Sequence, residues 1–350
     1  MSLDYSVKYQ PKIVERFKKG PLTNRGAGND YSFTGARSIK VYSMPTADMA
    51  DYGRGSTRFG TVSDAQYTTQ EMVCSQAKSF TRHFEALDSA DIAPGRVAGQ
   101  FLRMQIDEKI NPMLDKYRLK KWVMGAGTLK QMASAPTKNT IVGDIMDLKG
   151  AMGDNLVGDE NLTLYISNTY YILLKQADAV VGLEGMGTKS VEKGTVGTFD
   201  GMSVVPVPST WLPSGVYFVI KAPHSTVDPV KLAKYDMIEK AVGYSGPVIQ
   251  GLVYFDSFVM GERNVGIGVA GSSSAVLNAA TVTVNTHVAT VTAVTGVTWY
   301  YTDDGTDPRW SETRKAFPAG GVTLTSGMTN LRIIGEKDGC VTLEKTQAYA

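Results

Sequence analysis

The stretch that decides the fold is PGRVAGQFLRMQIDEKINPMLDKYRLKKW, residues 94–122. Apolar side chains recur in it at steps of three and four, which predicts one long helix with an apolar stripe that faces the core. The stripe consists of Leu102, Ile106, Ile110, Met113 and Tyr117. Pro94 suits the first turn of this helix. Pro112 lacks the amide hydrogen that a helix uses, so we expect a kink or a break near Asn111.

Two segments without a core of their own precede this helix. Residues 1–36 are polar and basic, which predicts an extended N-terminal arm that needs a partner surface. Its basic side chains either contact nucleic-acid phosphates or, the favoured interpretation, stay solvated or pair with acidic residues of a neighbour. Residues 37–88 hold two strand-like runs, 38–44 and 71–84, around a long polar middle. This pattern predicts a projecting hairpin that lies on another surface.

A mixed region of helices and strands follows the long helix. Residues 140–156 repeat apolar side chains on one face, which predicts a second helix. A strand at 162–167 leads into a helical run from Thr169, and the glycine-rich residues 182–202 predict a loop. Strand-like apolar runs then continue to residue 270.

The composition changes at residue 271. Gly271, Ser272, Ser273 and Ser274 predict a flexible linker within residues 271–277. Residues 278–350 alternate valine with threonine and carry several glycine turns, which predicts a small all-β sandwich.

The sequence presents no catalytic or cofactor-binding constellation. Glycines at 266, 268 and 271 have the spacing of a dinucleotide-binding turn, but serines and a strand follow where a helix should begin. Residues 182–190 miss the phosphate-loop pattern by one residue. The three histidines lack partners at metal-ligand spacing, and the acidic run 303–307 is typical of a turn. We therefore expect no enzyme, no cofactor and no metal.

The bulk composition is that of an ordinary globular protein. Hydrophobic residues make up 43% of the 350 residues, and the formal net charge is +2. This charge is too near neutral to make nucleic acid or a membrane the main partner. The two cysteines lie far apart, so we expect no disulfide framework and a reducing compartment. We also expect no signal peptide and no membrane span.

The order of these parts resembles the major capsid protein of tailed phages, whose fold is shared with the floor of herpesvirus capsids. The resemblance covers about residues 1–270 and rests on six segments: SIKVYSMPTADMADYGR (38–54), QAKSFTRHFEALD (76–88), INPMLDKYR (110–118), FDGMSVVPVPS (199–209), IKAPHSTVDPVKLAKYDMI (220–238) and VYFDSFVM (253–260). It implies an α+β capsid fold with an N-terminal arm (1–36), an E-loop hairpin (37–88), the spine helix with part of the peripheral or P-domain (89–134), mostly the axial or A-domain (135–240), and returning strands of the capsid core (241–270).

The C-terminal segment carries a resemblance of its own. WYYTDDGTDPR (299–309) and IIGEKDG (333–339) resemble the immunoglobulin-like domain at the C-terminus of chitobiase-type enzymes. Such domains also occur on phage capsids and tails. The resemblance implies an Ig-like domain over residues 278–350, displayed outward and able to bind surface glycans.

Together the resemblances imply a structural protein of the virion capsid that assembles in the host cytoplasm. Its subunits would form hexamers and pentamers of an icosahedral head around double-stranded DNA, with weak contact to the DNA and no membrane. Scaffolding and portal proteins are further implied partners. Asp48, Asp51, Arg54 and Arg58 near the hairpin tip are the candidate inter-subunit contacts. A chain cut after Val269 is expected to assemble still.

Two other functions remain open at this point. A carbohydrate-binding or carbohydrate-active protein with an accessory Ig-like domain would fit the C-terminal segment, although paired carboxylates in a recognisable setting are missing. A phage tail-tube protein can also carry such a domain, but the long helix argues against it because a tail-tube subunit is mainly a β-barrel.

Overall fold

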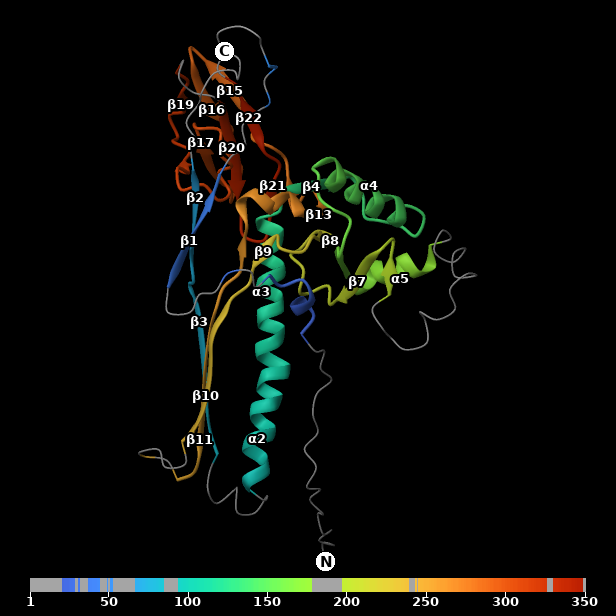
Figure 1. Ribbon diagram of the computed structural model, residues 1–350, viewed down its shortest axis with the longest axis vertical. Helices are drawn as coiled ribbons and strands as arrows, with labels where there is room; N and C mark the ends of the chain where they lie inside the picture. Colours follow the sequence, from blue (N-terminus) through green and yellow to red (C-terminus); the bar gives the residue numbers. More distant parts are fainter. Residues whose placement is uncertain are drawn as a thin grey trace, which may run out of the picture.

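The computed structural model has three parts along its length (Figure 1). It describes residues 21–28, 31, 37–44, 49, 51–52, 67–84, 94–177, 197–238, 243, 245–325 and 330–348. A long helix runs beside long strands at one end, a mixed sheet with two helices lies beside the second half of that helix, and an all-β domain lies at the other end. The end of the long helix lies where the three parts meet.

The long helix is continuous from Pro94 to Met124 but changes its winding once. It comprises α2 (Pro94–Gln105), the π-helical turn η2 (Ile106–Ile110) and α3 (Asn111–Met124). The amide of Asn111 bonds to the carbonyl of Ile106, five residues back. This wider turn accommodates Pro112, which has no amide hydrogen and whose ring crowds the preceding turn. The expected kink or break near Asn111 is therefore replaced by a π turn, and the helix runs on.

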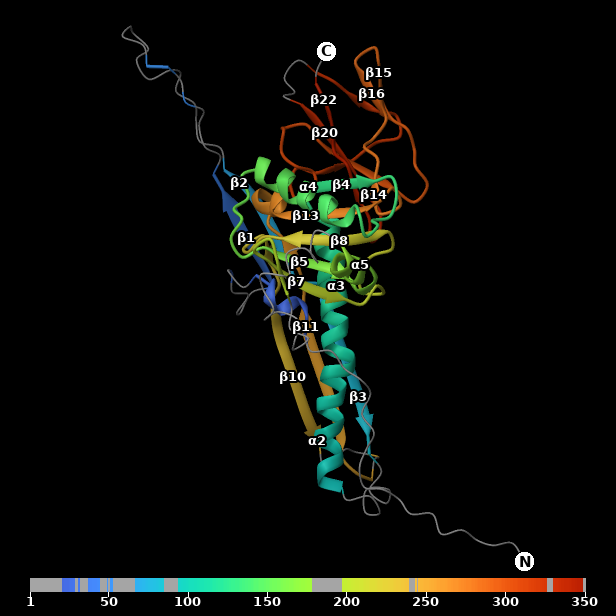
Figure 2. The same cartoon turned by 90° about the vertical axis from the view of Figure 1, so that its right-hand side faces the viewer.

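Three long antiparallel strands lie along this helix in both views (Figures 1 and 2). They are β10 (Val230–Ile238), β11 (Val248–Phe255) and β3 (Gln76–His83), in that order across the sheet. The end of the range 135–240, which is expected to be mostly A-domain, contains β10, and this strand joins the sheet beside the long helix.

A small core joins this sheet to the helix. Ile110 is buried against Val253 and Phe255 of β11, and further residues of the predicted stripe, Ile106, Met113 and Tyr117, pack partly buried on the same cluster. Leu102, nearer the start of the helix, is partly buried.

The predicted hairpin has two antiparallel strands, β1 (Ser38–Ser43) and β2 (Thr68–Val73), paired from Ser38 with Val73 to Ser43 with Thr68. The second strand-like run of the sequence, 71–84, was expected to be one strand. It divides at Cys74 and Ser75, so that β2 pairs with β1 while β3 joins β11. The chain thus passes directly from the hairpin into the sheet beside the helix.

The mixed sheet has six strands, with α4 (Ile141–Asp154) and α5 (Asn168–Gln176) on one face and α3 on the other. Its order is β4 (Thr128–Met132), β13 (Ile267–Ser272), β8 (Val216–Lys221), β5 (Thr163–Ser167), β7 (Met202–Val207) and β6 (Thr198–Phe199). Successive side chains of a strand point to opposite faces. In β5, Leu164 and Ile166 accordingly pack with α4 and α5, and Tyr165 packs with Trp122 of α3.

Residues after β13 form an all-β sandwich with a core of its own. One sheet holds β15 (Val282–Asn285), β16 (Val288–Val291) and β19 (Val322–Thr323); the other holds β18 (Lys315–Ala316), β17 (Thr298–Thr302), β20 (Leu331–Glu336) and β22 (Lys345–Gln347). Ala289, Leu331 and Ile333 are among the buried residues between them. A short parallel pair, β14 (Val276–Leu277) with β21 (Val341–Thr342), lies where the sandwich meets the mixed sheet (Figure 1).

The prediction of a flexible linker at Gly271–Ser274 is wrong. Gly271 and Ser272 are the last residues of β13, inside the mixed sheet. A Cβ on Gly271 would lie 2.9 Å from the carbonyl oxygen of Gly215, so this glycine allows close packing of strands rather than flexibility. A tight turn follows, and Ala275 and Val276 are fully buried in the core beneath it. Glycine and serine composition alone does not distinguish such a turn from a tether.

Candidate subunit interfaces

The described residues of the β1–β2 hairpin include several largely exposed apolar side chains. Tyr42, Met44, Met49, Tyr52 and Tyr67 are all more than 60% exposed, and Met49 is 98% exposed. Exposed aromatic and methionine side chains gathered on one projection are typical of a surface that another protein covers.

The opposite side of the hairpin is held on the subunit. Ile39 and Val41 of β1 pack with Met72 and Met260, and Met72 is completely buried. Gln70 of β2 reinforces this contact through both ends of its amide. Its Nε2 donates to the carbonyl of Val259 at 2.9 Å, and its Oε1 accepts the amide hydrogen of Gly261 at 2.9 Å. The root of the hairpin is thus fixed while its outer side stays open.

The passage from hairpin to sheet is anchored by the buried Asp256. Its carboxylate accepts hydrogen bonds from the amide (2.8 Å) and hydroxyl (2.9 Å) of Ser75 and from the hydroxyl of Tyr117 (2.7 Å). Burial, and then the hydrogen bond to this carboxylate, raise the pKa of Tyr117. Tyr117 therefore stays protonated as a donor and ties the long helix to the hairpin root.

Residues 22–28 run through the centre of the molecule, held by charged side chains of α3. The Asp115 carboxylate accepts the amides of Leu22 (2.8 Å) and Thr23 (3.2 Å) and the hydroxyl of Thr23 (2.5 Å). Arg118 donates to the hydroxyl of Thr23 at 3.2 Å and to the side-chain oxygen of Asn24 at 2.8 Å. Thr23, Asp115 and Arg118 are at most 5% exposed. Buried charges that are hydrogen-bonded in this way hold a segment firmly in place.

Asp228 holds the other end of this segment. Its carboxylate accepts the amide of Gly28 at 3.2 Å, the indole hydrogen of Trp122 at 3.0 Å and the hydroxyl of Ser257 at 2.5 Å. A Cβ on Gly28 would lie 1.7 Å from the carbonyl oxygen of Thr226, so only glycine fits. The root of the N-terminal arm is consequently part of the subunit core, and the core sets where the arm leaves.

Sequence reasoning missed this anchor for the arm. Asp115, Arg118 and Trp122 recur at steps of three and four, so they share a second face of the long helix. An aromatic residue beside two charged residues at helical spacing was the available signal. It could not reveal Asp228, which lies more than one hundred residues further along the chain.

The all-β domain is docked on the rest of the chain through a shared core. Val341 of β21 packs with Trp122, Val269 and Val276. The side-chain amide of Asn264 donates to Asp307 at 2.9 Å, and both residues are buried. A cut after Val269 would remove three residues of β13 and the contribution of Val276 and Val341 to this core, so we expect the truncated chain to be destabilised.

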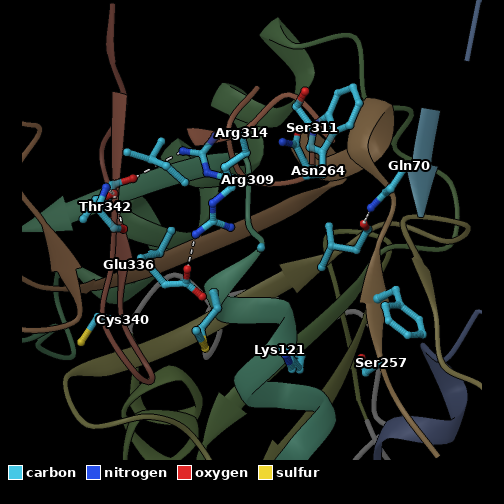
Figure 3. Close-up of a pocket in the computed structure, with 18 of the residues that line it drawn as sticks. Gln70, Lys121, Ser257, Asn264, Arg309, Ser311, Arg314, Glu336, Cys340 and Thr342 are labelled. Atoms are coloured by element: carbon cyan, nitrogen blue, oxygen red, sulfur yellow. Dashed lines mark hydrogen bonds and ion pairs between the residues drawn. The ribbon is translucent and has the colours of Figure 1, made fainter. Parts of the chain in front are cut away.

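A cleft of about 310 Å³ marks the remaining seam between the two parts (Figure 3). Gln70, Lys121 and Ser257 line it from one part. Arg314 lines it from the other, where its guanidinium lies 3.5 Å from the ring centroid of Tyr300 and pairs with Glu336. Arg314 and Glu336 thus pair within the wall that the all-β domain contributes to the cleft.

The structure resembles solved phage capsid structures over most of its length. A chain from Mycobacterium phage Che8 matches with a TM-score of 0.60 and 13% identity over 76% of this chain and 96% of that chain. A chain from the capsid of cyanophage P-SCSP1u gives 0.63 and 12% over 77% and 93%, and one from the mature capsid of bacteriophage PhiM1 gives 0.60 and 9% over 77% and 92%. The chain has the tailed-phage capsid fold. No family model matches the sequence, and no curated protein matches it.

We propose a correspondence between the parts of the capsid fold and the observed elements. In it the β1–β2 hairpin is the E-loop, α2 to α3 the spine helix, the β10–β11–β3 sheet the P-domain, and the mixed sheet with α4 and α5 the A-domain. The share of the chain outside the similarity is close in size to the all-β domain that follows β13.

Of the four predicted contact residues at the E-loop tip, the structure describes one. Asp51 is exposed, whereas Asp48, Arg54 and Arg58 lie outside the described residues. The structure therefore does not place the four together, and their pairing across subunits stays a prediction.

The aspartates of the predicted turn each have partners of their own. Asp303 pairs with Lys315 at 2.8 Å, and Asp307 pairs with Arg309 at 2.9 Å. Asp304 accepts hydrogen bonds from Thr306 and Thr313. Among the described residues, no group of three or more His, Cys, Asp or Glu is placed to hold a metal ion. The helices of the described ranges include none that is long and apolar enough to cross a membrane.

Proposed function

We propose that this chain is the major capsid protein of a tailed phage and self-assembles into the hexamers and pentamers of an icosahedral head enclosing double-stranded DNA. The observation that carries the proposal is the match to chains from the capsids of cyanophage P-SCSP1u and bacteriophage PhiM1 over 92–93% of their length. The exposed apolar side chains of the E-loop support it, because a subunit that functions alone gains nothing from them.

In this proposal the E-loop lies over a neighbouring subunit and buries Tyr42, Met49 and Tyr52 there. Each such side chain contributes about 1.5–3 kcal/mol when fully buried. Many contacts of this size, repeated around a closed shell, give a stable particle from individually weak interfaces. Asp51, with Asp48, Arg54 and Arg58, would add ion pairs that fix the register of the loop on its neighbour. The N-terminal arm, fixed at its root, would reach a second neighbour.

The proposal extends to location and partners. The protein would assemble in the host cytoplasm and reside in the virion capsid, with scaffolding and portal proteins as assembly partners. A net charge of +2 is compatible with weak contact to packaged DNA, since a strongly basic wall would retard packaging. The all-β domain would face outward and contact surface glycans, while its shared core with the capsid fold keeps it rigidly attached.

Deletion of residues 50–66 tests the role assigned to the E-loop. The deleted chain should keep its far-ultraviolet circular dichroism and melting temperature but form no closed shells in electron micrographs. Met49→Ser should also lower the yield of closed shells. Val294→Ser is the matched control, because Val294 is also exposed but lies in the all-β domain. Normal shells from the deleted chain would refute the assignment.

A further inference from the structure

The turn after α4 places a leucine where helices favour glycine. The amide of Leu156 bonds to the carbonyl of Gly153 at 2.8 Å, and the amide of Val157 bonds to that of Met152 at 3.1 Å. These two bonds define a Schellman motif in which Leu156 occupies the left-handed position, with φ of 60°. Val157 packs on the core below, as the motif requires. A residue with a Cβ costs roughly 1–2 kcal/mol at this position, and glycine avoids the cost.

The side chain of Leu156 compounds this cost because it is 94% exposed. None of the residues that the structure describes covers the leucine, so they compensate neither the backbone strain nor the apolar exposure. A strained backbone and an exposed apolar side chain at one position indicate a contact that the isolated subunit does not contain.

The surroundings of Leu156 suit a specific kind of partner. Asp154, Asp159 and Glu160 are exposed around this turn, so the leucine stands within an acidic rim. A matching surface combines an exposed apolar side chain with a basic one. α5 of the same A-domain provides it, since Ile172 is 55% exposed and Lys175 is exposed one turn further along the helix.

We infer that Leu156 of one subunit docks on the Ile172–Lys175 face of α5 in a second copy of this chain. The two surfaces are distinct, although they belong to neighbouring helices: α4 contacts α5 and covers β4 and β13, while α5 covers β5 and β7. A contact between unlike surfaces is head-to-tail, and repetition of a head-to-tail contact closes rings. The inference rests on the proposed function and identifies A-domain residues that join neighbours within a hexamer or pentamer.

Leu156→Gly tests the inference because its expected effects on thermal stability and on shell assembly have opposite signs. The variant should melt at or above the wild-type temperature, because the strain is removed, yet form fewer shells by at least tenfold. Asn161→Gly is the matched control, since Asn161 also has a positive φ, of 57°, and is exposed on the same domain. It should assemble like wild type. Wild-type shell yield from Leu156→Gly overturns the inference, whereas absence of shells from the wild-type chain itself would refute the proposed function instead.

A cysteine pair tests the partner surface. Leu156→Cys with Ile172→Cys, made together with Cys340→Ser to remove the partly exposed native thiol, should give a ladder of disulfide-linked oligomers after mild oxidation of assembled particles. Either single variant alone should give none. Absence of the ladder from intact shells overturns the assignment of α5 as the docking face.

Discussion

Asp115→Asn should release the root of the N-terminal arm while leaving the rest of the subunit folded. The substitution keeps the volume but converts one of the acceptor oxygens into a donor that faces the amide of Leu22 or the donors of Thr23. Hydrogen bonds to a charged group contribute about 1.5–3 kcal/mol each, and an unsatisfied buried donor costs about 1–3 kcal/mol. Loss of one such bond therefore weakens the arm root by about 2–3 kcal/mol.

Hydrogen exchange measures this loss directly. Amides open locally with their own free energies, and each 1.4 kcal/mol is a factor of ten. The amides of Leu22 and Thr23 should exchange about 30-fold to about 150-fold faster in Asp115→Asn than in wild type. Asp144→Asn is the matched control, because Asp144 of α4 pairs with Lys130 of β4 at 3.2 Å, away from the arm. Equal exchange in Asp115→Asn and wild type would refute the view that Asp115 holds the arm.

Further substitutions test the other anchors. Gly261→Ala places a Cβ 2.2 Å from the indole of Trp310, which belongs to the all-β domain. This substitution should destabilise the docking of that domain by about 1–3 kcal/mol, which would be seen as faster proteolysis between the all-β domain and the rest of the chain. Gly158→Ala, with open space around it, should leave the proteolysis rate unchanged. Tyr117→Phe removes the hydrogen bond to Asp256 and should cost about 1–2 kcal/mol in urea unfolding, and an unchanged midpoint would contradict the anchor. Partial burial raises the pKa of Asp304, but the hydrogen bonds from Thr306 and Thr313 outweigh burial and hold this pKa below the ordinary aspartate value. The stabilisation from Asp304 is therefore fully present above the ordinary aspartate pKa and is lost as the pH falls through the lowered pKa. Asp304→Asn should lower the melting temperature at pH 7, with the difference vanishing in acid; a constant difference would contradict this.

Local patterns in the sequence predicted the elements of the fold well. The three- and four-residue spacing of Ile106, Ile110, Met113 and Tyr117 is a property of the helix itself, so it predicted both the element and the face that meets β11. The π turn at η2 was not predictable, because proline indicates only that the regular winding fails, and the neighbouring chain decides whether the helix breaks or widens.

Contacts between distant segments were not predictable from composition. The glycine and serines at 271–274 suggested a tether, but strand neighbours in β4 and β8 and the buried Ala275 make them the edge of a core. The polar sequence of the arm predicted that it needs a partner surface, but it did not show that Asp115 and Asp228 of the same chain supply acceptors for the backbone at its root. The sequence did not show which distant residues the fold brings into contact with these two segments.

The most direct test of the account is electron microscopy of the purified full-length chain at low salt, followed by image classification by symmetry. The account predicts closed shells, or rings of five and six subunits, whose projections show the all-β domain on the outer surface. A chain that remains monomeric at its highest soluble concentration, both alone and when produced together with the scaffolding protein of its phage, would contradict it.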